Sequence, residues 1–132
     1  MLRFRSSRFI RPILLLTSML VGCRSTTDVS PVVALLVRPR GSNEVSGINI
    51  HIGEDLPLEA LPVRADSTRI DTAIAAAWNS TDTTKAVVSA EGVLHTRCVG
   101  STIIRASATV AGRLVTGQVR VSIGSFGQTC AP

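Results

Sequence analysis

The stretch that decides the fold runs from Gly100 to Ile123 and reads GSTIIRASATVAGRLVTGQVRVSI. Between its halves, Val110-Ala111-Gly112-Arg113 predicts a tight hairpin, because glycine adopts a positive φ without a Cβ to resist it. Apolar or small residues recur at alternate positions, namely Ile104, Ala106 and Ala108 in the first half, and Val115, Gly117, Val119, Val121 and Ile123 in the second. This alternation predicts two long antiparallel strands, each with one apolar face.

Shorter runs with the same alternation precede the hairpin. They are Val33, Leu35 and Val37; Ile48, Ile50 and Ile52; Leu56, Leu58 and Ala60; Ile74, Ala76 and Trp78; Ala86 and Val88; and Val93 with Leu94 after a turn at Glu91-Gly92. Turn-forming residues separate the runs about every eight to twelve positions, which is typical of a β-sandwich. No helical periodicity is sustained. The sequence therefore predicts an all-β fold.

Two of these runs carry further expectations. Pro57 and Pro62 cannot donate to a strand ladder, so their run predicts an edge strand or one interrupted by a bulge. Alanine favours helix, and residues 73–77 also fit a short helix. We favour a strand there, because Asn79-Ser80-Thr81-Asp82 ends the run in the manner of a turn.

The N-terminal residues 1–22 are typical of a secretory signal. Four arginines (Arg3, Arg5, Arg8 and Arg11) precede nine apolar-biased residues, Ile13 to Val21, and small Gly22 precedes Cys23. A permanent membrane-spanning helix needs about 20 apolar residues, so this run is too short to be one. The tetrapeptide Leu20-Val21-Gly22-Cys23 resembles the processing site of bacterial lipoproteins. The alternatives are an ordinary signal peptide and a buried structural cysteine.

This resemblance implies a lipid anchor at Cys23. In bacterial lipoproteins the cysteine sulfur receives diacylglycerol, the preceding peptide bond is cut, and the new amine is acylated. Arg24 rather than Asp follows the cysteine, which in the enterobacterial sorting pattern implies the outer membrane. Residues 23–31 then form a lipidated polar tether, in which the eight residues after Cys23 reach at most about 29 Å. A domain spanning residues 32–132 follows.

Removal of the signal changes the charge balance. The whole chain has 14 Lys and Arg against nine Asp and Glu, for a net charge of +5, and four of those arginines lie in the signal. The mature chain is therefore close to neutral and keeps no block of clustered cations. Its only aromatic residues are Trp78 and Phe126. Since nucleic-acid binding needs clustered cations or stacking platforms, we expect no nucleic-acid partner.

The two remaining cysteines, Cys98 and Cys130, predict a disulfide, because exported proteins meet an oxidising compartment. The bridge closes a loop of about 33 residues and stabilises the fold by about 3 to 4 kcal/mol in the chain-entropy model. The alternative is a metal site that combines Cys98 with His95 and with His51 or Cys130. Two isolated ligands do not make a zinc site, so we expect no metal.

The ordered set of motifs resembles the group 2 bacterial immunoglobulin-like domain, which occurs in invasin- and intimin-like surface proteins. The likeness covers Val33 to Ile123 and rests on Val33-x-Leu35-x-Val37-x-Pro39; Gly53 followed by Leu58 and Ala60; Trp78-Asn79-Ser80-x-Asp82; Ala86-x-Val88; Gly92-Val93; Gly100-x-x-x-Ile104-x-Ala106; and Val119-x-Val121. It implies an immunoglobulin-like sandwich of about seven strands, with Trp78 buried between the sheets and Gly92 and Gly100 at turns. The prolines, the long segment from Arg64 to Thr72 and the cysteines depart from the family pattern.

The resemblance implies no catalytic residues. His51 and His95 are candidate general bases, with Asp55, Asp66 or Asp71 as partners, but no nucleophile motif accompanies them. We therefore expect no enzymatic activity and no cofactor. The expected function is docking on another cell-envelope protein, through loops or an exposed strand edge. The alternatives are a small-ligand or calcium-binding module, with Glu54, Asp55 and Asp82 as loop ligands, and an adhesin fragment.

Overall fold

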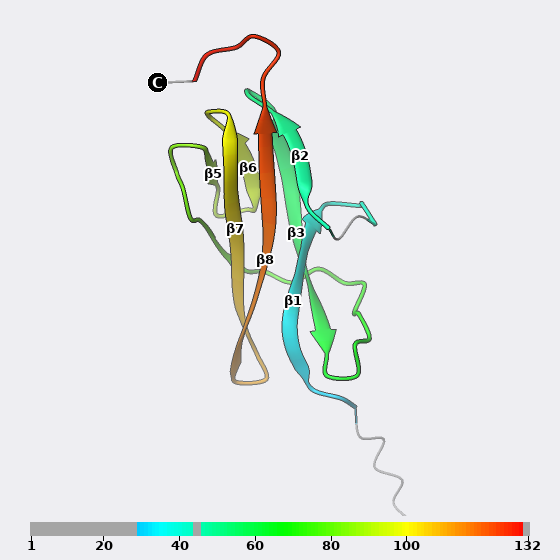
Figure 1. Cartoon of the computed structure of the whole chain (residues 1–132). Coiled ribbons are helices and arrows are strands. Elements are labelled where there is room, and N and C mark those ends of the chain that lie inside the picture. Colours follow the sequence, from blue (N-terminus) through cyan, green and yellow to red (C-terminus); the bar gives the residue numbers. More distant parts are fainter. Residues whose placement is uncertain (1–28, 44–45, 131–132) are drawn as a thin grey trace, which may run out of the picture.

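The computed structural model describes residues 29–43 and 46–130. These residues form eight strands: β1 (Val32–Pro39), β2 (Ile48–His51), β3 (Asp55–Arg64), β4 (Ala77–Ser80), β5 (Ala86–Val88), β6 (Val93–Thr96), β7 (Gly100–Val110) and β8 (Arg113–Gly124) (Figure 1). They contain no helix, and so none that is long and apolar enough to cross a bilayer. The predicted all-β class is confirmed. The signal and Cys23 lie outside the described residues.

The strand order is that of an immunoglobulin-like sandwich. One sheet runs β1-β3-β6-β5 and the other β2-β8-β7-β4. Immunoglobulin constant-type domains pair strands in the orders ABED and CFG. With β2 left aside, the seven remaining strands taken in chain order as A to G reproduce both orders. The eighth strand, β2, adds a parallel edge beside β8.

The closing hairpin forms as the sequence predicts. β7 and β8 pair antiparallel from Gly100 opposite Ile123 to Val110 opposite Arg113. Ala111 and Gly112 make the two-residue connection, with φ of 49° and 74°. Two consecutive positive φ values are typical of the type I′ turn, whose twist matches that of the flanking strands.

The core lies between the two sheets and takes its side chains from both. The buried apolar residues are Leu35, Val37, Leu58, Ala60, Ala86 and Leu94 from one sheet, and Ile48, Ile50, Ile104, Ala106, Val115, Val119, Val121 and Ile123 from the other. The first predicted run departs from the alternation at Val33, which is 45% exposed. The β1–β3 register shifts between Val32 and Ala34. Because a bulge changes the parity of a strand, Val33 leaves the core face.

Of the two expectations for the proline-containing strand, the edge position is wrong, because β3 lies between β1 and β6. The pairing of β3 with β1 is irregular, but the extra residue lies in β1, between Val32 and Ala34. The backbone tolerates both prolines for a local reason. The carbonyl of Pro57 accepts from the amide of Arg40, one residue beyond the end of β1. The carbonyl of Pro62 accepts from Ile70, in a segment that makes only isolated bridges to β3. In a strand, the nitrogen of a residue points to the same side as its carbonyl. The nitrogens of Pro57 and Pro62 therefore face these segments and interrupt no regular ladder.

The segment before β4 passes from one sheet to the other. Ile74 bridges to Ala60 in β3, and β4 then begins at Ala77 and pairs with β7. Residues 73–77 form no helix, so the helical alternative is wrong. The predicted turn after Trp78 is also misplaced, since the strand continues to Ser80. The Ser80 hydroxyl lies 3.0 Å from that of Thr102 in β7, a cross-strand partner that keeps this turn-prone residue in the ladder.

Candidate functional site

The two ends of the sandwich carry different groups (Figure 1). At one end lie the start of β1, the end of β3 and the β7–β8 connection; we call it the tether end. At the opposite end lie the ends of β2 and β8 and the start of β3; we call it the distal end. The predicted site residues Glu54, Asp55, His95 and Cys98 come from segments that meet at the distal end.

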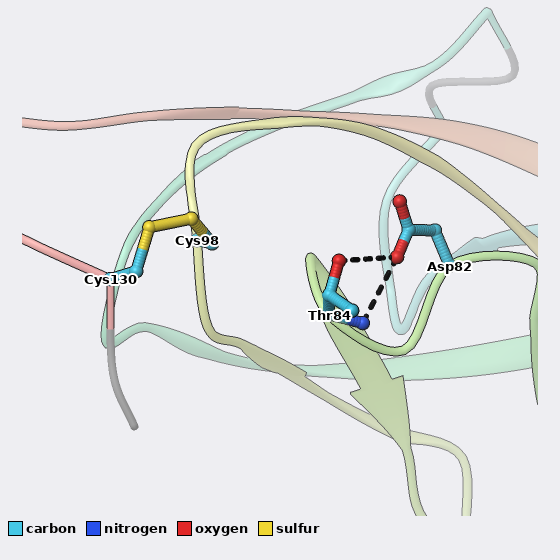
Figure 2. The surroundings of a disulfide bond; sticks show 4 residues. All are labelled: Asp82, Thr84, Cys98 and Cys130. Carbon is cyan, nitrogen blue, oxygen red and sulfur yellow. Dashed lines mark hydrogen bonds between the residues drawn. A yellow bond between two sulfur atoms is a disulfide. The ribbon is translucent and has the colours of Figure 1, made fainter.

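The disulfide between Cys98 and Cys130 is present, with the two Cα atoms 4.3 Å apart (Figure 2). It fastens the segment after β8 to the connection between β6 and β7. The amide of Cys98 also donates to the carbonyl of Lys85 at 3.1 Å, so the bridge is continuous with the loop before β5. Since each sulfur is bonded to the other, neither thiolate can ligate a metal beside His95.

Asp82 closes the loop that leads from β4 to β5. Its Oδ1 accepts from the Thr84 hydroxyl at 2.6 Å and from the Thr84 amide at 3.0 Å (Figure 2). The hydroxyl hydrogen bond, aided by the amide and the charge of Lys85, holds the pKa of Asp82 below its ordinary value of 3.8. Hydrogen bonds to the ionised form favour that form. The carboxylate therefore acts as a turn-closing group.

Both histidines lie at the distal end, each beside a carboxylate. His95 in β6 is opposite Asp55 in β3, and its Nδ1 lies 2.7 Å from Asp55 Oδ1. His51 Nδ1 lies 3.6 Å from Glu54 Oε2, and its ring stacks on Phe126 with centroids 4.0 Å apart. Within residues 29–43 and 46–130, neither ring has a Ser, Thr or Cys side chain as hydrogen-bond partner. Within this part of the chain the two pairs are therefore not arranged as a nucleophile and its base.

The three candidate calcium ligands each have a separate partner. Glu54 accepts from the backbone amide of His51 at 2.8 Å, Asp55 pairs with His95, and Asp82 binds Thr84. Across the part of the chain that the structure describes, no group of three or more His, Cys, Asp or Glu side chains is arranged to hold a metal ion. Hard cations prefer several converging oxygens, and these carboxylates do not converge.

Trp78 lies on the flank of the sandwich, half-buried rather than enclosed between the sheets. It packs over Gly92, whose φ is 82°, and it lines a hollow of about 270 Å³ together with Arg40, Leu58, Glu59, Ala60, Ala73, Ile74, Ala75, Ala76, Ala90 and Glu91. Because β4 is an edge strand, Trp78 packs against the core from the side of the sandwich. Gly100, the third expected signature residue, begins β7 and is exposed.

A basic surface that our sequence analysis missed covers the outside of the β2-β8-β7-β4 sheet. No Asp or Glu occurs in any of these four strands. The polar side chains at its outward positions, which we call the basic face, are exposed or half-exposed: Asn49, Asn79, Arg105, Ser107, Thr116, Gln118, Arg120 and Ser122. Part of this face is a hollow of about 410 Å³ between Asn79, Arg105, Thr116 and Gln118.

Arg105 and Arg120 are the charged groups of this face. Arg105 is opposite Gln118, and Arg120 is opposite Ile103, so the two arginines are diagonal neighbours on adjacent strands, where such positions lie about 7 to 8 Å apart. Among the described residues neither has an ion-pair partner; the acidic partners of Arg38 and Arg69 lie outside this sheet. Two unneutralised guanidinium groups favour an anionic ligand.

Comparison with known proteins identifies no relative. No family model matches the chain, and no curated protein is significantly similar to it. Function is therefore inferred from the residues and their geometry.

Proposed function

We propose that this chain is a non-catalytic, lipid-anchored protein of the bacterial cell envelope, held at the outer membrane by Cys23. Its immunoglobulin-like module, similar to the group 2 bacterial domains, docks on another envelope protein. The observation that carries the proposal is the basic face, where Arg105 and Arg120 lie side by side without an acidic partner among the described residues. Arginine is enriched at protein interfaces, where its planar guanidinium group binds a carboxylate through two parallel hydrogen bonds.

The face is a better docking surface than the strand edges. Of the four edge strands, β2 and β4 have four residues and β5 has three. The longest, β1, packs against β8 through Leu35 and Gly117. Strand addition needs a long unpaired edge, and these edges offer few free backbone groups for pairing. The sheet face presents amides, hydroxyls and two guanidinium groups over several strands.

The chemistry of the face favours an acidic protein surface over nucleic acid. Two arginines provide far fewer phosphate contacts than the six to ten of many DNA-binding proteins. No aromatic side chain lies on the face, so bases would find no stacking platform. The amides of Asn79 and Gln118 add donors and acceptors around Arg105. A partner with neighbouring carboxylates and polar side chains fits this pattern.

The experiment is in-cell crosslinking and pull-down of the full chain, with captured proteins identified by mass spectrometry. Beside it run Cys23→Ala, which removes the anchor, and Arg105→Glu/Arg120→Glu, which reverses the face. The matched control is Arg40→Glu/Arg97→Glu, which changes the same charge at two exposed arginines off the face. We expect one dominant envelope protein with the wild type and the control, and its loss in the other two. Capture by Arg105→Glu/Arg120→Glu at wild-type level would contradict docking through this face.

A second candidate function is the binding of a small polar solute beside Trp78. The indole N–H has no hydrogen-bond partner within the described residues, and Trp78 lines the hollow together with Arg40 and Glu91. Because Trp78 is the only tryptophan, its emission reports any occupant directly. A solute that shifts this emission in the wild type, and does so more weakly in Glu91→Gln, would favour this function. The same titration with calcium, compared with Asp55→Ala and Asp82→Ala, tests the calcium-binding alternative.

A further inference from the structure

Two large apolar side chains are exposed at the tether end. Val29, where the described chain enters, is 63% exposed, and Leu114, just after the β7–β8 connection, is 68% exposed. Between these segments lies a hollow of about 440 Å³, lined by Val29, Ser30, Pro31, Val32, Arg64, Ile70, Val110, Ala111 and Arg113. In Figure 1 the start of β1, the end of β3 and the hairpin connection lie together at this end. The lining is mostly aliphatic.

Arg64 and Arg113 supply positive charge beside this apolar hollow. Neither has an acidic group within ion-pair distance among the described residues. The acids that follow β3 are already engaged: Asp66 accepts from the hydroxyl and the amide of Thr68, and Asp71 pairs with Arg69. The Thr68 hydroxyl is the main cause that lowers the pKa of Asp66, and the charge of Arg64 is the smallest contribution. Both guanidinium groups are therefore open to an external anion.

The length of the tether places this end close to the membrane. Five residues separate Cys23 from Val29, so the distance from the anchor to the described chain is at most about 22 Å. That reach is shorter than the sandwich is tall, since β8 alone has 12 residues, or about 40 Å at the usual rise per residue. Of the two ends, only the tether end can rest on the bilayer while the strands stand away from it.

We propose that the tether end binds the anionic phospholipid surface of the membrane that holds the anchor. Arg64 and Arg113 bind headgroup phosphates, and Leu114 and Val29 lie at the boundary between headgroups and acyl chains. Amphipathic surfaces of this composition bind bilayers through buried apolar area together with attraction to anionic lipids. The inference rests on the lipid anchor of the proposed function. It also orients the basic face sideways, toward neighbouring proteins.

The test uses the full acylated chain, reconstituted in vesicles that contain brominated phosphatidylcholine, with or without phosphatidylglycerol. Leu114→Trp places an indole at the tether end, and Phe126→Trp is the matched control, since Phe126 is 78% exposed at the distal end. Trp78 is common to both variants. We expect bromine to quench the emission of Leu114→Trp more strongly than that of Phe126→Trp, and the difference to be larger on anionic vesicles. Adding Arg64→Gln/Arg113→Gln should weaken the lipid-docked orientation about fivefold for each arginine. Adding Arg105→Gln/Arg120→Gln should not.

Hydrogen exchange of the unsubstituted chain gives a second readout that no substitution can disturb. We expect the amides of residues 110–114 to gain protection on anionic vesicles relative to zwitterionic ones. Equal quenching in the two tryptophan variants would overturn the proposal. So would quenching at position 114 that is the same on anionic and zwitterionic vesicles. The mass of the N-terminal peptide reports acylation of Cys23 separately. An unacylated chain that still binds added anionic vesicles through Arg64 and Arg113 would refute the anchor but support the surface.

Discussion

Gly117 in β8 lies directly against the backbone of Leu35 in β1, at the side where the two sheets meet. A Cβ on Gly117 would overlap the carbonyl oxygen of Leu35 and would lie 2.7 Å from the carbonyl carbon. The missing side chain therefore lets β1 approach β8 closely enough to close this flank of the sandwich. The same approach leaves the longest edge strand without an open side, which favours docking through the sheet face.

Substitution of Gly117 by alanine should destabilise the domain by about 3 kcal/mol, because the obstructing atoms belong to the backbone and cannot rotate away. The measurement is the free energy of unfolding in denaturant. Gly124→Ala is the matched control, since a Cβ there would meet only the ring of His51 at an ordinary 3.5 Å. Equal stability of the two variants would show that β1 can move away from β8 at little cost.

The packing of Trp78 over Gly92 makes a second prediction. A Cβ at Gly92 would lie 3.0 Å from both Cε2 and Nε1 of the indole. Gly92→Ala should therefore push the ring outward, shift its fluorescence to the red, and lower stability by about 1 to 3 kcal/mol, since φ is also in the left-handed region. Gly41→Ala separates the two causes, because Gly41 has a φ of 74° and open space around it. An unshifted emission in Gly92→Ala would refute the packing argument.

The disulfide makes a third prediction. Cys98→Ser/Cys130→Ser should lower the free energy of unfolding by about 3 to 4 kcal/mol, the chain-entropy value for a loop of this length. The segment after β8 should also become a protease site, because its residues 125–130 are exposed and held chiefly by this bond. Limited proteolysis with and without reductant checks the second point. The double variant should match the reduced wild type; a more stable reduced wild type would mean that the serines, and not the lost bond, cause the effect.

The sequence predicted features that depend on local alternation and failed where position depends on pairing. The β7–β8 hairpin followed from period-two alternation around Ala111-Gly112. The internal position of β3 did not follow, because nothing local to Pro57 shows that its nitrogen lies beyond the end of β1. The basic face was missed for a related reason. Arg105 and Arg120 are not clustered in the sequence, and they become neighbours only through the hairpin register.

The contact between a histidine and a carboxylate at the distal end shows the same limit. The sequence marks Asp55 and His95 as candidate residues, yet only the antiparallel pairing of β3 with β6 brings them to 2.7 Å. Cys98 and Cys130 were easier to pair, because the even count in an exported chain left few choices. The cysteine count therefore predicts the covalent link, whereas the contact between Asp55 and His95 depends on the strand order.

Acid sensitivity supplies a last prediction, centred on Asp82. Its pKa in the folded chain lies below 3.8, chiefly because the Thr84 hydroxyl donates to the carboxylate. A group whose folded pKa is depressed stabilises the protein fully above the unfolded pKa, and the contribution is lost as the pH falls through the folded value. Stability should therefore decline below about pH 4, and Thr84→Val should raise the pKa of Asp82 toward its ordinary value. NMR titration of the Asp82 carboxyl carbon measures its pKa in the wild type and in Thr84→Val, with Thr83→Val as the neighbouring control. An Asp82 pKa that is the same in wild type and Thr84→Val would show that the hydroxyl does not hold this carboxylate.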